Sequence, residues 1–106
     1  MAGAAGEVVV RHPEGRAFFV RLDADASAEG ALSLGRQLCP GERVNCRVMG
    51  WIDRSAIPPG YPVPSASRAQ LTFSYVREAD REIMLYDCKH FPATPRDSCI
   101  PPARRV

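Results

Sequence analysis

The chain has 106 residues and a formal charge of +2, and 45% of its residues are hydrophobic and 25% charged. These values are average for a globular domain, so they exclude a disordered, collagen-like or coiled-coil chain. The apolar runs are too short to cross a bilayer. Because the arginines are spread along the chain without a basic tract, we expect no nucleic-acid partner. We expect one domain over residues 1–106, with a flexible leader at 1–6.

The cysteines predict disulfides and an oxidising compartment. Their spacings are C-x6-C and C-x10-C, whereas zinc modules pair ligands about two to four residues apart. We therefore expect no metal and no cofactor. Instead we favour bridges between Cys39 and Cys46 and between Cys88 and Cys99, in a periplasmic or secreted protein.

The N-terminal sequence does not support export by itself. Residues 1–6 have neither the charged nor the apolar region of a signal peptide. We expect that a leader or a preceding domain has been removed from this chain. In a complete cytosolic chain, the thiols would instead be reduced and the disulfide prediction would fail.

The first half of the chain predicts a hairpin, a helix and a strand. β-branched and aromatic runs at 7–11 and 16–22 flank a turn at 12–15 that contains Pro13 and Gly15. Helical spacing from 26 to 38 follows a group of N-cap residues, and Gly35 lies on the apolar stripe, where it permits close approach to a sheet. Residues 43–53 then alternate, with Cys46 and Val48 facing the helix and Met49 and Trp51 on the other face.

The second half predicts a long loop, two strands and a tail. Residues 54–68 are rich in proline and show neither helical nor strand periodicity, which is typical of a binding loop. Strands are expected at 69–77, with Leu71, Phe73 and Tyr75 on one face, and at 82–88. The strand at 82–88 is apolar on both faces, so we expect it to be central in the sheet. A disulfide would hold the Pro-rich tail, 92–106, against the body.

The fold class predicted from this order is α+β. It is a mostly antiparallel sheet of about five strands, in the sequence order ββαβββ, with one helix packed on one face.

The candidate ligand-binding residues are Trp51, Asp53, Arg54 and Tyr61. If the face with Val48 is buried under the helix, Trp51 lies on the opposite face, near the aromatic of the Pro-rich loop. With neighbouring arginines, such aromatics suit a protein, peptide or carbohydrate ligand. The competing interpretation is that the loop folds over Trp51 and forms a second small core. We expect a non-enzymatic binding domain, and the sequence specifies neither its ligand nor its oligomeric state.

Two other functions remain open. His12 and His90 are the only near-neutral acid and base groups, and a small secreted hydrolase with ribonuclease-like chemistry needs such a pair. The sequence does not say whether they approach each other. A structural subunit of a larger assembly is the third class, and it would purify in a stable complex.

Overall fold

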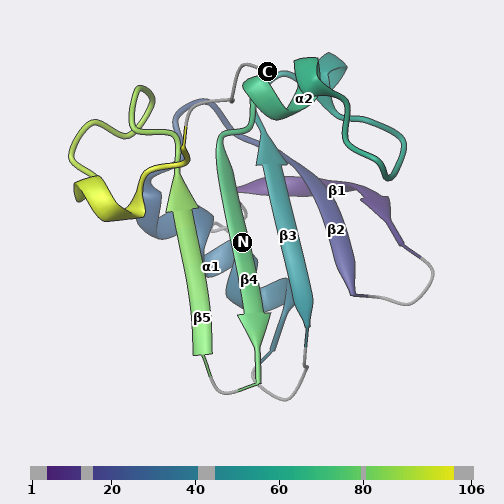
Figure 1. Cartoon of the computed structure of the whole chain (residues 1–106), viewed down its shortest axis with the longest axis horizontal. Helices are drawn as coiled ribbons and strands as arrows, with labels where there is room; N and C mark the ends of the chain where they lie inside the picture. Colours follow the sequence, from purple (N-terminus) through teal and green to yellow (C-terminus); the bar gives the residue numbers. More distant parts are fainter. Residues whose placement is uncertain (1–4, 13–15, 41–44, 80, 102–106) are drawn as a thin grey trace.

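The structure, a computed structural model, describes residues 5–12, 16–40, 45–79 and 81–101. These residues form a five-stranded sheet with the strands in sequence order and helix α1 (Ala28–Leu38) on one face (Figure 1). The strands are β1 (Gly6–Arg11), β2 (Ala17–Leu22), β3 (Cys46–Trp51), β4 (Phe73–Glu78) and β5 (Arg81–Tyr86). Strands β2 and β3 are parallel and joined through α1, whereas the other neighbours are antiparallel. The predicted α+β class is therefore confirmed.

Helix α1 packs closely on the sheet. It begins after Ser27, whose hydroxyl oxygen accepts a hydrogen bond from the Gly30 amide at 2.9 Å. A Cβ atom placed at Gly35 would lie 2.6 Å from Cγ of Tyr75 in β4. The predicted role of Gly35 is thus confirmed, because any larger side chain would separate the helix from the strand.

The core between α1 and the sheet is closed by a disulfide. Cys39 at the end of α1 is bonded to Cys46 at the start of β3, with their Cα atoms 5.7 Å apart, as predicted. Both cysteines are buried, and they join a cluster of buried apolar side chains. That cluster includes Phe18, Val20, Leu22, Ala31, Leu34, Val48, Phe73, Tyr75 and Phe91.

A polar network connects α1 to β4 and to the edge strand β5. The Glu82 carboxylate in β5 accepts hydrogen bonds from the guanidinium of Arg36 in α1, from the Tyr75 hydroxyl at 2.7 Å and from Arg77 at 3.2 Å. The Arg36 hydrogen bond, followed by that from Tyr75, lowers the pKa of Glu82 to about 2. The carboxylate therefore stays charged and binds the helix to β4 and β5 at neutral pH.

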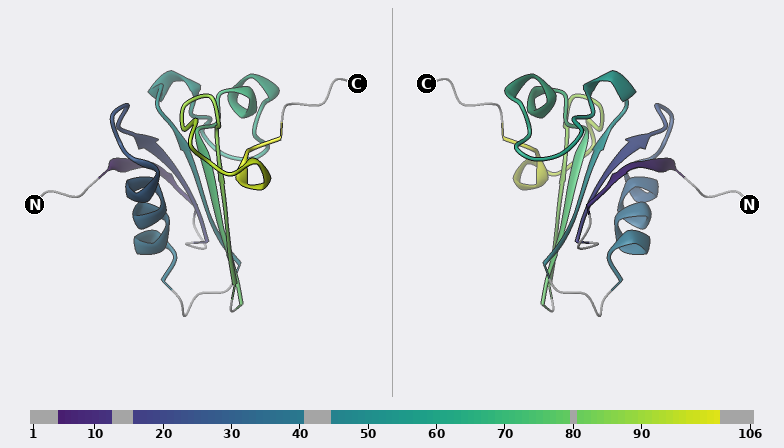
Figure 2. Two further views of the ribbon diagram at one scale, coloured as in Figure 1. Left: turned by 90° about the vertical axis from the view of Figure 1, so that its left-hand side faces the viewer. Right: turned by 90° about the vertical axis from the view of Figure 1, so that its right-hand side faces the viewer.

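The other face of the sheet is covered at one end only (Figure 2). The segment after β3 forms two short helices, η1 (Arg54–Ala56) and α2 (Ser65–Ala69), which lie over the end of the sheet near Trp51. A second buried cluster lies beneath them, made of Phe19, Met49, Trp51, Ala56, Val63 and Leu71. The remainder of this face, over the opposite ends of β3, β4 and β5, has no helix of the described residues against it, and we call it the open face.

The segment 54–72 corrects two predictions. Residues 54–68 contain helical turns where none was expected, because helices this short have no detectable periodicity and depend on tertiary packing. Since α2 extends to Ala69, β4 starts at Phe73 rather than at 69. As a result Leu71 packs in the second cluster and does not share a face with Phe73 and Tyr75.

Strand β5 is an edge strand, and the prediction that it is central was wrong. The alternation itself is confirmed. Met84 and Tyr86 pack against the core under α1, whereas Ile83 and Leu85 belong to neither buried cluster. The strand is therefore apolar on both faces, with side chains on both of them partly buried, but only one face packs against a core cluster of the described residues.

The ends of the described chain are attached to the body. Cys88 and Cys99 form the second predicted disulfide, with a Cα separation of 5.5 Å, and the Ile100 amide donates to the Tyr86 carbonyl at 2.8 Å. The expected tail is held in this way up to residue 101, with a short helix η2 (Arg96–Ser98), and 102–106 lie outside the described residues. At the other end β1 already begins at Gly6, so the expected leader is shorter than 1–6. The predicted turn at 12–15 falls mostly outside the described residues.

Two general properties follow. Two disulfides in a small domain are consistent with an oxidising extracytoplasmic location. In the described ranges no helix has the length and apolar character needed to span a bilayer.

Candidate functional site

The Trp51 side chain is inside the protein. It is 0% exposed, and its indole N–H donates to the carbonyl of Ser67 in α2 at 2.7 Å. Phe19 contacts it edge to face, with ring centroids 5.3 Å apart. The loop folds over Trp51 and forms a second core, so the expected exposed platform does not include this side chain.

Asp53 and Arg54 are exposed but already have partners. The Asp53 carboxylate accepts hydrogen bonds from the Ser55 hydroxyl at 2.7 Å and the Ser55 amide at 2.9 Å, which lower the pKa of Asp53. It thereby caps η1. Arg54 forms an ion pair with Glu7 at 3.0 Å. Both contacts position the chain after β3, and ligand binding by these two residues stays a prediction.

Among the four predicted ligand-binding residues, Tyr61 is the aromatic one whose ring is exposed at the surface. It is 50% exposed, and no other large hydrophobic side chain in the described ranges is classed as exposed. The ring packs on His12 and Phe19 at centroid distances of 5.0 and 5.4 Å. Because one side of the ring is fixed by these neighbours, the other side is a preformed contact surface.

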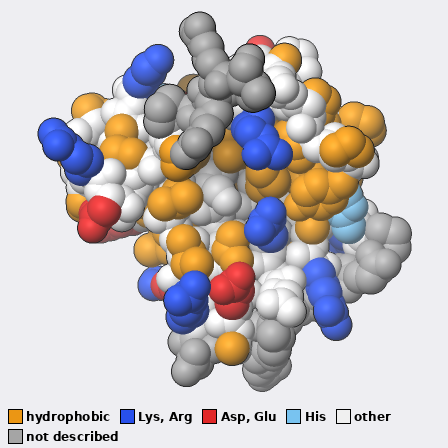
Figure 3. Space-filling view, in the orientation of Figure 1, with side chains coloured by type: hydrophobic (Ala, Val, Ile, Leu, Met, Phe, Trp, Pro, Cys, Tyr) orange, Lys and Arg blue, Asp and Glu red, His pale blue; other side chains and the backbone are white. Residues whose placement is uncertain are grey.

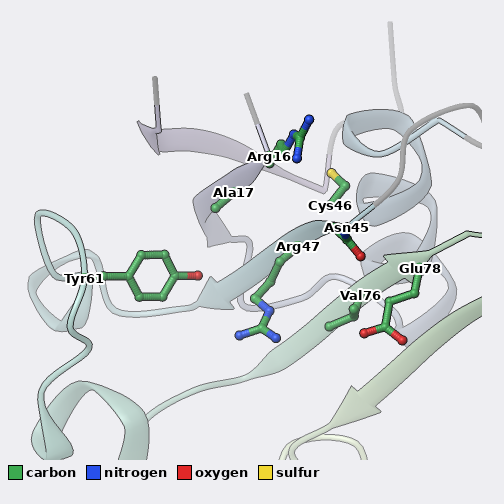
Figure 4. A pocket seen from close by; sticks show the side chains of 8 residues that line it. All are labelled: Arg16, Ala17, Asn45, Cys46, Arg47, Tyr61, Val76 and Glu78. Carbon is green, nitrogen blue, oxygen red and sulfur yellow. The ribbon is translucent and has the colours of Figure 1, made fainter. Parts of the chain in front are cut away.

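A hollow of about 280 Å³ lies between Tyr61 and β4 (Figure 4). Its sides carry the Tyr61 ring, the Arg47 side chain and Val76; Arg16 also lines it, but its side chain points away from Arg47. Figure 4 shows Arg47 extending from β3 into the space between Tyr61 and Val76. Arg47 is exposed and has no ion-pair partner among the described residues. An aromatic ring and a free guanidinium therefore face the same space.

An apolar patch continues from this hollow across the open face. Val76 in β4 is paired with Ile83 in β5, and Leu85 lies two residues further along β5 opposite Ser74. The three apolar residues are partly exposed, and we refer to Val76, Ile83 and Leu85 as the apolar patch. Figure 3 shows hydrophobic side chains over this part of the sheet, with lysine or arginine side chains beside them.

A second hollow, of about 400 Å³, lies between α2 and the segment held by the Cys88–Cys99 disulfide. Leu71 and Ile100 supply apolar lining, and Arg68 and Lys89 supply positive charge. Like Arg47, these two cations have no ion-pair partner in the described part of the chain. A second basic hollow therefore lies beside the end of the sheet that α2 covers, on the same side of the sheet as the open face.

The structure does not bring the two histidines together. His12 follows β1 and packs against Phe19 and Tyr61, whereas His90 follows β5 and packs against Phe91. Strands β1 and β5 are the opposite edges of the sheet, about 19 Å apart at roughly 4.8 Å per strand spacing. This separation offers no shared site for an acid and a base acting on one phosphodiester.

The described residues contain neither a free cysteine nor a cluster of metal-binding side chains. All four cysteines are in disulfides. Over the described ranges no group of three or more metal-binding side chains is gathered. The open face is therefore the feature that most needs a functional explanation. Its signal was present in the sequence as the apolar residues on both faces of 82–88.

Comparison of the chain with models of protein families, with curated proteins and with solved structures finds no match.

Proposed function

We propose that the protein is a non-enzymatic binding domain of a periplasmic or secreted protein, and that it binds its ligand on the open face. The observation that carries this proposal is the composition of β5. A strand with apolar side chains on both faces is typical of a strand that is covered on both faces. Here all four side chains are partly buried; Met84 and Tyr86 pack against the core under α1, whereas Ile83 and Leu85 belong to neither cluster, and we assign these two to a partner.

The construction of the surface supports the same function. The Tyr61 ring is fixed by two aromatic neighbours, and the strands beneath the apolar patch are joined by a continuous ladder of pairs. Little conformational entropy is lost when a partner docks on such a rigid surface. Contiguous partly exposed apolar residues with a polar rim mark interaction sites in proteins of this kind.

The test uses a photo-crosslinking amino acid at position 85, in the apolar patch. The matched control carries the same amino acid at position 33, where Ser33 is exposed on α1 on the other side of the sheet. Each protein is irradiated with the extracellular fraction of its source. We expect a discrete product from position 85 that excess wild-type protein suppresses and excess Ile83→Asp protein does not. Equal labelling from both positions, or labelling unaffected by either competitor, would reject the open face as the site.

The other function classes give different results in the same material. A structural subunit would be recovered from its source in a stable stoichiometric complex without crosslinking. A hydrolase would show activity on RNA that is lost on replacing either His12 or His90, with a bell-shaped pH dependence where histidine titrates. No contact in the described structure favours the hydrolase, since the two side chains lie at opposite edges of the sheet.

A further inference from the structure

Cations without ion-pair partners line the two hollows beside the open face. Arg47 lies in the row of residues that runs across β3, β4 and β5 through Val76 and Ile83. Arg16 lines the same hollow as Arg47, and Arg68 and Lys89 line the second hollow. None of these four cations forms an ion pair within the described ranges.

Most cations elsewhere in the described chain have ion-pair partners. Arg36 and Arg77 share Glu82, and Arg21 and Arg54 share Glu7. The exceptions among the described residues are Arg11, which lies over the Phe18 ring, and Arg96 in η2. The whole chain carries only +2, so net charge alone does not favour an acidic partner.

Acidic groups do not cancel the positive charge of the two hollows. Glu78 and Asp87 line the two hollows, but Glu78 is paired with Arg81 at 3.5 Å. The Asp87 carboxylate accepts a hydrogen bond from the backbone amide of Lys89 at 3.1 Å, so it keeps its negative charge. Among the residues that line the two hollows, four cations and one carboxylate, that of Asp87, have no ion-pair partner in the described chain. Positive charge therefore exceeds negative charge at the two hollows.

We infer that the partner of the open face is an acidic protein segment with interspersed apolar side chains. This inference rests on the proposed function and adds the chemistry of the partner. Carboxylates would meet Arg47 in one hollow and Arg68 and Lys89 in the other, while apolar side chains cover the patch. Complementary charge selects such a partner and speeds its association, and apolar contact supplies the affinity.

A sulfated carbohydrate would satisfy the same cations, but it fits the surface less well. Its rings carry charged groups along the whole chain and have no alkyl side chains, so they would cover Val76, Ile83 and Leu85 less completely. A ligand of this kind would gain less from burial of the apolar patch. The patch therefore favours a protein segment.

The experiment titrates the isotope-labelled full chain, with its disulfides formed, with blocked peptides and follows the backbone amides by NMR. The first peptide alternates glutamate with leucine. The second has lysine in place of glutamate, and the third has serine in place of leucine. We expect the first peptide to shift amides of β4, β5 and Arg47, and the other two to bind at least about tenfold more weakly. Raising the ionic strength from about 0.05 M to about 0.5 M should weaken binding of the first peptide.

Two charge-reversal variants distinguish a local effect on the open face from an effect of the net charge of the protein. Arg47→Glu should weaken binding of the glutamate–leucine peptide about tenfold, whereas Arg11→Glu, which changes charge equally on the α1 side, should leave it within about twofold. Both arginines are exposed, so both variants are expected to keep the dispersed spectrum of the folded protein.

The outcomes also distinguish this inference from the proposed function. Equal binding of the lysine–leucine peptide at the same amides would overturn the acidic partner and leave the open face as a binding surface. If a heparin-derived oligosaccharide binds tightly and Ile83→Asp does not weaken this binding, the acidic protein partner is overturned in favour of a sulfated carbohydrate. Failure of every peptide, together with specific crosslinking from position 85, would refute the inference alone. Failure of both experiments would refute the function as well.

Discussion

The close contact between α1 and β4 makes opposite predictions for two glycines of the same helix. Replacing glycine by alanine inside a helix ordinarily stabilises it by about 0.5–1 kcal/mol, because alanine loses less backbone entropy. At Gly35, however, the new Cβ atom would lie 2.6 Å from Cγ and 3.0 Å from Cβ of Tyr75. At Gly30 its nearest neighbours would be the Ala5 methyl and the Ser27 hydroxyl, both at 3.4 Å.

The expected magnitude for Gly35→Ala follows from what must move. Carbon atoms pack comfortably at about 3.5–4.0 Å, so helix and strand must separate by about 1 Å. Tyr75 cannot turn aside easily, because it is fully buried and its hydroxyl donates to Glu82. Overpacking of this kind costs about 1–3 kcal/mol. After the gain in helix propensity, we expect a net loss of about 1–2 kcal/mol in the free energy of unfolding.

Urea unfolding of the oxidised protein measures both variants. Gly35→Ala should lower the denaturation midpoint with an unchanged slope, and Gly30→Ala should raise it slightly or leave it in place. The double variant Gly35→Ala, Tyr75→Phe keeps the aromatic ring in contact with the new methyl group, so its free energy of unfolding should fall at least as much as that of Gly35→Ala. Equal or greater stability of Gly35→Ala than of the wild type would refute the close contact between α1 and β4.

Three further perturbations test other parts of the structure. The folded-state pKa of Glu82 is lowered to about 2, so the Glu82 carboxylate contributes fully to the free energy of unfolding above about pH 4.5, and this contribution is lost as the pH falls toward 2. The contribution amounts to about 2 kcal/mol. Glu82→Gln should therefore lower the free energy of unfolding by this amount at neutral pH and flatten the acid branch of a stability–pH curve. Trp51→Phe leaves a cavity and the Ser67 carbonyl without its donor, so we expect a loss of about 2–3 kcal/mol in urea unfolding; a loss below about 0.5 kcal/mol would contradict the burial of the indole. Replacing Cys88 and Cys99 together by alanine should lower the free energy of unfolding by about 3 kcal/mol, because the unfolded chain is then no longer restricted by a closed loop of this length. Peptide mapping of this variant should still find the Cys39–Cys46 disulfide. Scrambled pairing in the wild type would contradict both bridges.

The burial of Trp51 also changes how the site is tested. A surface aromatic can be truncated without loss of stability, and the predicted binding site assumes that Trp51 is such a residue. In the structure Trp51→Ala would remove the centre of the second core and cost about 3–5 kcal/mol, so lost binding would not be distinguishable from lost folding. Tyr61 is half exposed, and Tyr61→Ala is the variant that probes the surface with little effect on the fold.

Local patterns were sufficient for most of the framework. Alternation in 43–53 placed Cys46 and Val48 on one face and Met49 and Trp51 on the other, as observed, because successive strand residues point to opposite sides. The same periodicity placed Cys39 and Cys46 at adjoining ends of the helix and strand, which predicted their disulfide. Helix α2 escaped detection because five residues are too few for a helical pattern.

The sequence by itself determined the types of the five strands and of helix α1, the faces of the alternating residues in 43–53, and the favoured disulfide pairing, since each of these depends on periodicity or on short separations along the chain. The order of the strands and the cover on each face were decided by the tertiary structure. For β5 the sequence shows apolar residues on both faces, and only the assembled sheet shows that it is an edge strand with one face open. For Trp51 the sequence gives its side of the sheet, but its burial depends on the path of 54–72. Both outcomes depend on contacts between distant segments, which no local pattern encodes.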